Sequence, residues 1–219
     1  VRGTQADIQA LSNLLFLNTI EFANQTLNNR ISYSNYITLQ PVNKQMNVAT
    51  SFNYGTSANQ IEMLNGHLLH QQNYTGTGKI IAVLDSGFLN VNTVQPFQRL
   101  FDNNLILGGY NYITQNTDVY SLHDHGTLVL SCMGGYVDGQ LVGTAPDAAY
   151  YLFVTEDVSS ENPVEESYWV EAAEEADRLG VDVITSSLGY FDYDNPNYSH
   201  TYSQMTGNQA FVSRGANVA

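Results

Sequence analysis

Apolar residues recur along the chain with two different periods, and these periods predict where strands and helices lie. Short apolar runs predict strands at 80–84, 105–113, 149–154 and 181–187. Apolar residues three and four apart predict helices at 125–134, 163–179 and 203–214. Such alternation predicts an α/β fold of three layers, with helices on both faces of a mostly parallel sheet. The runs IIAVL and VDVIT are apolar enough for strands covered on both sides.

The residues before this alternating region carry a weaker pattern. Helical spacing within 5–15 involves Ile8, Leu11, Leu14 and Leu15, and FLNTIEFAN then alternates like a strand. A polar, Asn-rich stretch without a period indicates a linker or extended segment at 31–55. A further helix with one apolar face is predicted from Ile61, Leu64, Leu68 and Leu69. We therefore divide the chain into a helix and strand at 1–30, a linker at 31–55 and an α/β unit at 56–219.

The charge balance excludes several partners. The 219 residues include 21 Asp and Glu but only 7 Lys and Arg, which gives a formal net charge of -14. So few cations cannot build the basic face that nucleic acids or anionic membrane surfaces require. No stretch approaches the roughly 20 apolar residues of a membrane span. An acidic chain with 15 Tyr and many Asn suits a secreted, extracytoplasmic protein.

Cys132 is the single cysteine of the chain, which excludes an intrachain disulfide. Its apolar neighbours in LVLSCMGG predict a buried, inert thiol. A nucleophilic cysteine is the alternative.

The strand predicted at 80–84 ends in an aspartate, Asp85, and breaks at once on Ser86 and Gly87. Reactive side chains collect just beyond the carboxyl ends of parallel strands. Gly87 provides the backbone freedom for the chain to leave the strand sharply. Asp85 is therefore a candidate functional carboxylate, and an aspartate that only caps the following turn is the alternative.

A second candidate lies in LHDHGT, where His125 begins a predicted helix and Gly126 allows a close backbone approach. The helix dipole disfavours positive charge at that end, which suits a neutral imidazole acting as a general base. Two histidines in HDH also raise the question of a metal. On an extended chain His123 and His125 point in opposite directions, so we assign no metal ligands.

Taken together and in this order, the motifs resemble the subtilisin-like serine proteases. AVLDSG is followed by HGT after 40 residues (125 minus 85), as in the Asp and His motifs of that family. GTAPDAAYYLFV resembles its turn into the next strand, and GVDVITSSLG its substrate-binding strand and loop. The resemblance covers 56–219. One departure is Leu128, which stands where the family usually has a second histidine; that position is structural in the family.

The resemblance implies acyl transfer by a secreted endopeptidase with a polypeptide substrate. By this resemblance, Asp85 would accept a hydrogen bond from one nitrogen of His125, and the other nitrogen would take the proton of a serine hydroxyl. Backbone groups of Ser187, Leu188 and Gly189 would bind an extended substrate peptide. The segments TEDVSSENPVEE and YFDYDNPNYSHTYS differ from common members and are candidate specificity elements.

The family's nucleophile lies in a Gly-Thr-Ser motif well after the stretch that matches SRGANVA, and no counterpart follows here. We therefore expect an N-terminal fragment, inactive alone, whose partner is the missing C-terminal part of the same protease. Residues 1–30 resemble the last helix and strand of the family's propeptide, with an extension of the mature enzyme as the alternative. No cofactor is assignable, although the family often binds calcium.

Two other classes compete with this interpretation. A phosphotransferase or metal hydrolase could use Asp85 as nucleophile or ligand, but such an enzyme would require a second acidic residue two positions after Asp85. A catalytically inactive relative that acts as an interaction protein is the other alternative. A phosphate-binding loop is disfavoured because GTGK precedes its strand and lacks the required glycine spacing.

Overall fold

The computed structural model describes residues 4–14, 17, 19–20 and 51–219. In this part of the chain the main sheet has four strands in the order β2-β5-β1-β6, and all neighbours are parallel. Their bounds are β1 Ile80–Asp85, β2 Ile106–Asn111, β5 Ala149–Val154 and β6 Val183–Ser186. The predicted strands are therefore confirmed to within a few residues at their ends.

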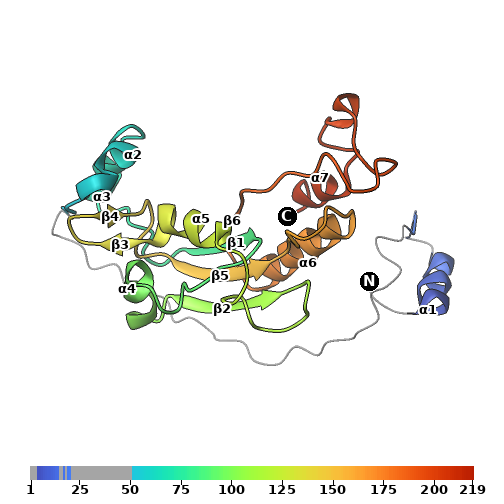
Figure 1. Cartoon of the computed structure of the whole chain (residues 1–219), viewed down its shortest axis with the longest axis horizontal. Helices are drawn as coiled ribbons and strands as arrows, with labels where there is room; N and C mark the ends of the chain where they lie inside the picture. Colours follow the sequence, from blue (N-terminus) through green and yellow to red (C-terminus); the bar gives the residue numbers. More distant parts are fainter. Residues whose placement is uncertain (1–3, 15–16, 18, 21–50) are drawn as a thin grey trace.

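Two helices cover opposite faces of the sheet (Figure 1). They are α5 His125–Gly134 and α6 Val164–Arg178. The pleat of the strands decides which side chains meet which helix, because successive residues point to opposite faces. In β1, Ala82 and Leu84 pack in the cluster that contains the α6 residues, whereas Ile81 and Val83 pack in the cluster that contains Leu130 of α5. The three-layer α/β fold is thus confirmed.

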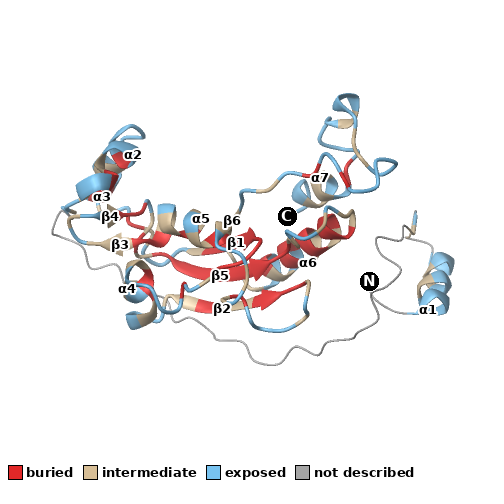
Figure 2. Cartoon of the chain, in the orientation of Figure 1, coloured by how far each residue is buried: buried red, intermediate tan, exposed pale blue. Residues whose placement is uncertain are grey.

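The core lies along the two strands at the middle of the sheet. Burial in Figure 2 is concentrated on β1, β5 and the sheet-facing side of α6. All six residues of β5 are buried, and so are five of the six in β1. Strands covered on both faces explain why these runs are apolar at nearly every position. No helix in the described part of the chain combines the length and apolar character needed to cross a bilayer.

Some elements were not predicted from the pattern. A short helical segment, η3 Gln95–Phe97 and α4 Gln98–Asp102, precedes β2, and a small antiparallel hairpin joins β3 Tyr136–Val137 to β4 Leu141–Val142. These elements are too short to show a period of their own.

The helix predicted from Ile61 and the following leucines is wrong in detail. The structure has three short pieces, η2 Gly55–Ser57, α2 Ala58–Glu62 and α3 Gly66–Gln71. Asn65 adopts a left-handed conformation with φ 57° and breaks the helix between α2 and α3. Only Ile61 of the predicted apolar face is buried, since Leu64, Leu68 and Leu69 are exposed. One change in helix direction separates these leucines from the core.

The prediction of one continuous helix at 203–214 is also wrong. A single turn, η4 Tyr202–Gln204, is separated by turns from α7 Phe211–Ala216. Gly207 and Asn208, which lie between the two, are poor helix formers.

At the amino-terminal end the structure describes one short helix. It consists of α1 Gln5–Ala10 followed by η1 Leu11–Asn13, and Thr4 and Asp7 form a capping box at its start. The strand predicted in FLNTIEFAN and most of the linker predicted at 31–55 lie outside the described residues. The division of this region therefore stays a prediction.

Candidate active site

The candidate carboxylate lies at the carboxyl end of β1, in the middle of the sheet. Asp85 is the last residue of the strand, and its side chain is fully buried. The chain leaves the strand through Gly87, whose φ is 150°. A Cβ atom on Gly87 would lie 2.7 Å from the backbone nitrogen of His123. Glycine is therefore needed here because the segment before α5 passes directly against this turn.

His125 reaches the carboxylate from the first residue of α5. Its Nδ1 lies 2.7 Å from Oδ1 of Asp85. Gly126 makes this approach possible, since a Cβ atom there would lie 2.4 Å from the carbonyl oxygen of Gly87 and 2.9 Å from Cβ of Asp85. The His125 side chain is 43% exposed while that of Asp85 is 0% exposed. One ring nitrogen thus contacts a buried carboxylate, while the ring as a whole is partly open to solvent.

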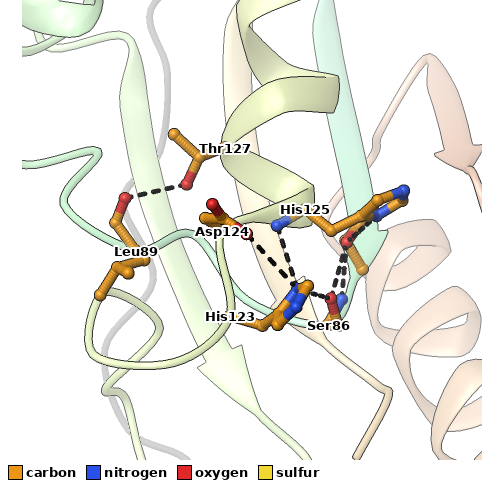
Figure 3. A network of polar contacts seen from close by, with 7 residues as sticks. Ser86, Leu89, His123, Asp124, His125 and Thr127 are labelled. Carbon is orange, nitrogen blue, oxygen red and sulfur yellow. Dashed lines mark hydrogen bonds and ion pairs between the residues drawn. The ribbon is translucent and has the colours of Figure 1, made fainter. Parts of the chain in front are cut away.

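Ser86 and His123 complete a polar network around this pair (Figure 3). The backbone N–H of Ser86 donates to Oδ1 of Asp85 at 2.7 Å, and the Ser86 hydroxyl lies 3.2 Å from the same oxygen. His123 Nδ1 lies 3.3 Å from the Ser86 hydroxyl and accepts from the backbone N–H of His125 at 3.2 Å. Ser86 was not singled out from the sequence, although its place next to Asp85 was the available signal.

The expectation that His123 and His125 point in opposite directions is wrong. Asp124, between them, has φ -94° and ψ -2°, so the chain is not extended there. Both imidazoles contact the same strand end, one through Ser86 and the other through Asp85. No group of three or more His, Cys, Asp or Glu side chains within the described ranges is arranged to hold a metal ion.

The predicted substrate-binding residues lie at the same edge of the sheet as Asp85. Leu84 of β1 pairs with Ser186 of β6, so Ser187 leaves β6 at the level at which Asp85 ends β1. Ser187 and Gly189 are exposed, whereas Leu188 is half-buried and packs against the cluster on the α6 side. The segment is therefore accessible and anchored by one side chain.

Two carboxyl groups beside the site have raised pKa values. Glu156 follows β5, and burial raises its pKa to about 8, although a hydrogen bond from the Tyr190 hydroxyl acts in the opposite direction. Glu165, near the start of α6, has its pKa raised by burial to about 7, against hydrogen bonds from the backbone of Asn162 and Asp157. The charge on Asp85 also raises the pKa of Glu156. Both carboxyl groups lie in TEDVSSENPVEE, which the sequence indicated only as a candidate specificity element.

A Gly-Thr-Ser triplet does occur in the chain, at residues 55–57, before both candidate catalytic residues. The Ser57 hydroxyl donates to the carbonyl oxygen of Tyr54 at 2.7 Å and accepts from the backbone N–H of Val142 at 3.0 Å. These contacts fix the start of α2 against β4. Ser57 is therefore a structural residue rather than a nucleophile for His125.

The prediction of a buried Cys132 is wrong, because the thiol is exposed. Cys132 lies one helical turn beyond Leu128, whose side chain is 61% exposed, on the outer face of α5. The sequence of α5 is apolar on all sides, which is typical of a helix covered on both sides. The described structure covers only the side that faces the sheet.

Comparison with known proteins agrees with the order of the motifs. A model of the subtilase family matches residues 76–217, which is well over half of the chain. No curated protein matches the chain significantly.

Several solved structures are similar to parts of the chain. MycP1 from the ESX-1 type VII secretion system is 17% identical with a TM-score of 0.49, over 81% of this chain and 45% of that one. The MycP3 protease from the type VII (ESX-3) secretion system is 25% identical with a TM-score of 0.47, over 64% and 38% of the two chains. MycP1 from Mycobacterium smegmatis is 18% identical with a TM-score of 0.38, over 64% and 40%.

This chain spans less than half the length of these structures. The family assignment rests on the matched family model, whose range includes Asp85, His125 and the segment Ser187–Gly189. The chain belongs to the subtilase family.

Proposed function

We propose that the chain supplies the aspartate and histidine of a serine peptidase that cleaves peptide bonds by acyl transfer. The observation that carries the proposal is the 2.7 Å contact between His125 Nδ1 and Asp85 Oδ1, with the carboxylate fully buried and the imidazole half-exposed. A buried carboxylate fixes the tautomer of the ring, since it accepts the proton on Nδ1. Nε2 is then the free base.

In the proposed reaction, His125 Nε2 takes the proton of a serine hydroxyl as that oxygen attacks the substrate carbonyl. The imidazolium that forms is stabilised by the Asp85 carboxylate, and it then protonates the leaving amine. Water repeats the sequence on the acyl-enzyme. A peptide that runs along Ser187–Gly189 would lie beside the strand end that carries Asp85. The substrate in this proposal is therefore an extended polypeptide.

We further propose that the nucleophilic serine comes from a polypeptide segment outside this chain, and that the chain alone does not cleave peptides. Two surfaces support this idea. The outer face of α5 exposes Leu128 and Cys132, and β6 forms an edge of the described sheet with Val183 50% exposed. A segment that continues the sheet beyond β6 and packs on α5 would cover both surfaces. We place the assembled enzyme outside the cytoplasm, in line with its acidic composition.

The alternative chemistries are less well supported. Oδ1 of Asp85 accepts from His125 and from two groups of Ser86, which is the environment of an orienting carboxylate rather than of a nucleophile. An inactive interaction protein would have no reason to keep the His125 ring half-exposed above a buried charge, although its apolar surfaces would be used in the same way.

Labelling with a fluorophosphonate, which reacts with activated serines, tests the proposal on the full-length protein that carries this chain. We expect a labelled serine outside residues 1–219. Asp85→Asn should slow labelling by about 10⁴-fold, because the imidazole then loses its negative partner and its tautomer.

The control is Asp182→Asn, which removes an exposed carboxylate that binds Lys79 at the opposite end of the sheet. This variant should be labelled at the unsubstituted rate. An unchanged rate for Asp85→Asn would contradict the proposed role of the carboxylate. Labelling of the 219-residue chain alone would contradict an external nucleophile, and a full-length protein that never reacts would favour the inactive relative.

A further inference from the structure

The orientation of the Asp85 carboxylate depends on only one of its two oxygens. Oδ1 receives the contacts of His125 and Ser86 described above. Oδ2 is buried and has no hydrogen-bond partner among the described residues. A carboxylate that is hydrogen-bonded through one oxygen can rotate if one of those hydrogen bonds is lost. The hydrogen bond from the Ser86 hydroxyl therefore has a large effect on the orientation of the Asp85 carboxylate.

The Ser86 hydroxyl has one proton and two possible acceptors. Asp85 Oδ1 lies 3.2 Å away and His123 Nδ1 lies 3.3 Å away. His123 Nδ1 also accepts from the backbone N–H of His125. Its lone pair is therefore occupied, which leaves Asp85 Oδ1 as the acceptor of the hydroxyl proton. A further contact holds the hydroxyl oxygen in place.

That contact comes from the opposite face of the sheet. The indole Nε1–H of Trp169, in α6, donates to the Ser86 hydroxyl oxygen at 3.0 Å. An indole N–H can only donate, so Ser86 must use a lone pair for Trp169 and direct its proton elsewhere. Trp169 is 7% exposed and Ser86 is 5% exposed, which leaves little room for water to replace the contact. Packing of α6 on β1 fixes the indole in this position.

We propose that Trp169 is a positioning residue for the reaction. Its indole N–H orients the Ser86 hydroxyl toward Asp85 Oδ1, and the hydroxyl then holds the carboxylate in the orientation that His125 requires. The inference rests on the proposed peptidase function. It makes α6, which carries no reacting group, part of the catalytic geometry.

A double-mutant cycle on the full-length protein tests this role. Trp169→Phe keeps an aromatic ring but removes the N–H, and Ser86→Ala removes the hydroxyl. Each should slow fluorophosphonate labelling by about 3- to 10-fold, which corresponds to one hydrogen bond. The double variant should be no slower than Ser86→Ala alone, because Trp169 acts through Ser86. Effects that multiply, or an unchanged rate for Trp169→Phe, would overturn the proposal.

Tyr150→Phe serves as the control. It removes another buried hydrogen bond, the one that the Tyr150 hydroxyl of β5 donates to the carbonyl oxygen of Ala145 at 2.7 Å. The labelling rate of this variant should not change. A general loosening of the fold would slow Tyr150→Phe and Trp169→Phe alike, and that result would count against a specific role for the indole.

Fluorescence of the 219-residue chain separates this inference from the proposed function. Trp169 is the only tryptophan in the chain, so its emission reports directly on the indole environment. Ser86→Ala should shift the emission maximum to shorter wavelength, because the N–H loses its partner in an apolar site. An unshifted spectrum would show that Trp169 does not hold Ser86. A protein that cannot be labelled at all would instead refute the peptidase function, and the spectrum would still decide the contact.

Discussion

Gly126 shows how one missing side chain decides whether two candidate catalytic residues meet. The residue has no room for a Cβ atom, since the carbonyl oxygen of Gly87 and the Cβ of Asp85 both lie within 2.9 Å of that position. Any side chain at 126 would therefore move the start of α5 away from β1. His125, the neighbouring residue, would move with it.

We predict that Gly126→Ala lowers the free energy of unfolding by about 1 to 3 kcal/mol, because the backbone must shift to admit a methyl group. It should also slow fluorophosphonate labelling of the full-length protein. Urea denaturation measures the first effect. Gly189→Ala is the control for stability, since a Cβ atom there meets nothing within 4 Å. Equal stability of the two variants would contradict the close packing of Gly126 against Gly87 and Asp85.

The sequence predicted the candidate site at this scale only in part. Asp85 and His125 could be selected because one ends an apolar strand and the other begins an apolar helix. Their order relative to known motifs then supported both choices. Trp169 could not be found in this way, because its contact with Ser86 depends on how α6 rotates over the sheet. A periodic pattern indicates which face of a helix is buried, but not which single atom on that face meets a polar partner.

The connection from β5 to α6 is the element whose chemistry depends most on pH. Burial raises the pKa values of Glu156 and Glu165 to about 8 and about 7, above the ordinary value of 4.5. A carboxyl group whose pKa is raised in the folded state stabilises the fold fully below its ordinary pKa. This contribution is lost as the pH rises through the folded value. Folding stability should therefore fall between about pH 5 and pH 8.

We predict that Glu156→Gln removes part of this loss. The free energy of unfolding of the variant should exceed that of the unsubstituted chain by about 1 to 2 kcal/mol at pH 8.5 and by little at pH 4.5. The difference is limited because the Glu156 carboxyl is not fully buried. Urea denaturation at several pH values measures it. Glu174→Gln, which removes an exposed charge from α6, should show the same pH dependence as the unsubstituted chain. If the stability of Glu156→Gln fell with pH as steeply as that of the unsubstituted chain, the raised pKa of Glu156 could not be the cause of the fall.

Prediction of the elements succeeded where the pattern was long and failed where helices were short. The helix at 125–134 and the strand at 149–154 agree with the structure residue for residue. The leucines after Ile61 gave a false helix because a left-handed residue, Asn65, redirects the chain between α2 and α3. The spacing of apolar residues gives no sign of such a turn.

On the scale of the whole molecule, the sheet brings distant parts of the sequence to one edge. A parallel α/β fold was predicted, but the order β2-β5-β1-β6 was not, because the apolar pattern of a strand does not identify its neighbours. This order puts β1 between β5 and β6, so Asp85 and the segment Ser187–Gly189 leave the sheet together. The candidate site is a result of this topology.

We predict that the thiol of Cys132 reacts rapidly with a disulfide reagent in the 219-residue chain and at least about 10-fold more slowly in the full-length protein. The reason is that the outer face of α5, exposed here, would be covered by the segment that supplies the serine. Absorbance of the released thiol product gives both rates. Cys132→Ser in the full-length protein identifies any signal from other cysteines, and equal rates would show that this face stays open.

The central position of β1 also has a consequence for synthesis on the ribosome. Ile80 pairs with Ala149, 69 residues later (149 minus 80), and Ile81 pairs with Val183, 102 residues later (183 minus 81). At roughly 5 to 20 residues per second, translation takes about 3 to 14 s to deliver the first of these partners. Throughout that interval the nascent strand IIAVL has no β-partner and is prone to aggregation. The strand that later carries Asp85 would therefore be a substrate for chaperones that bind apolar nascent segments.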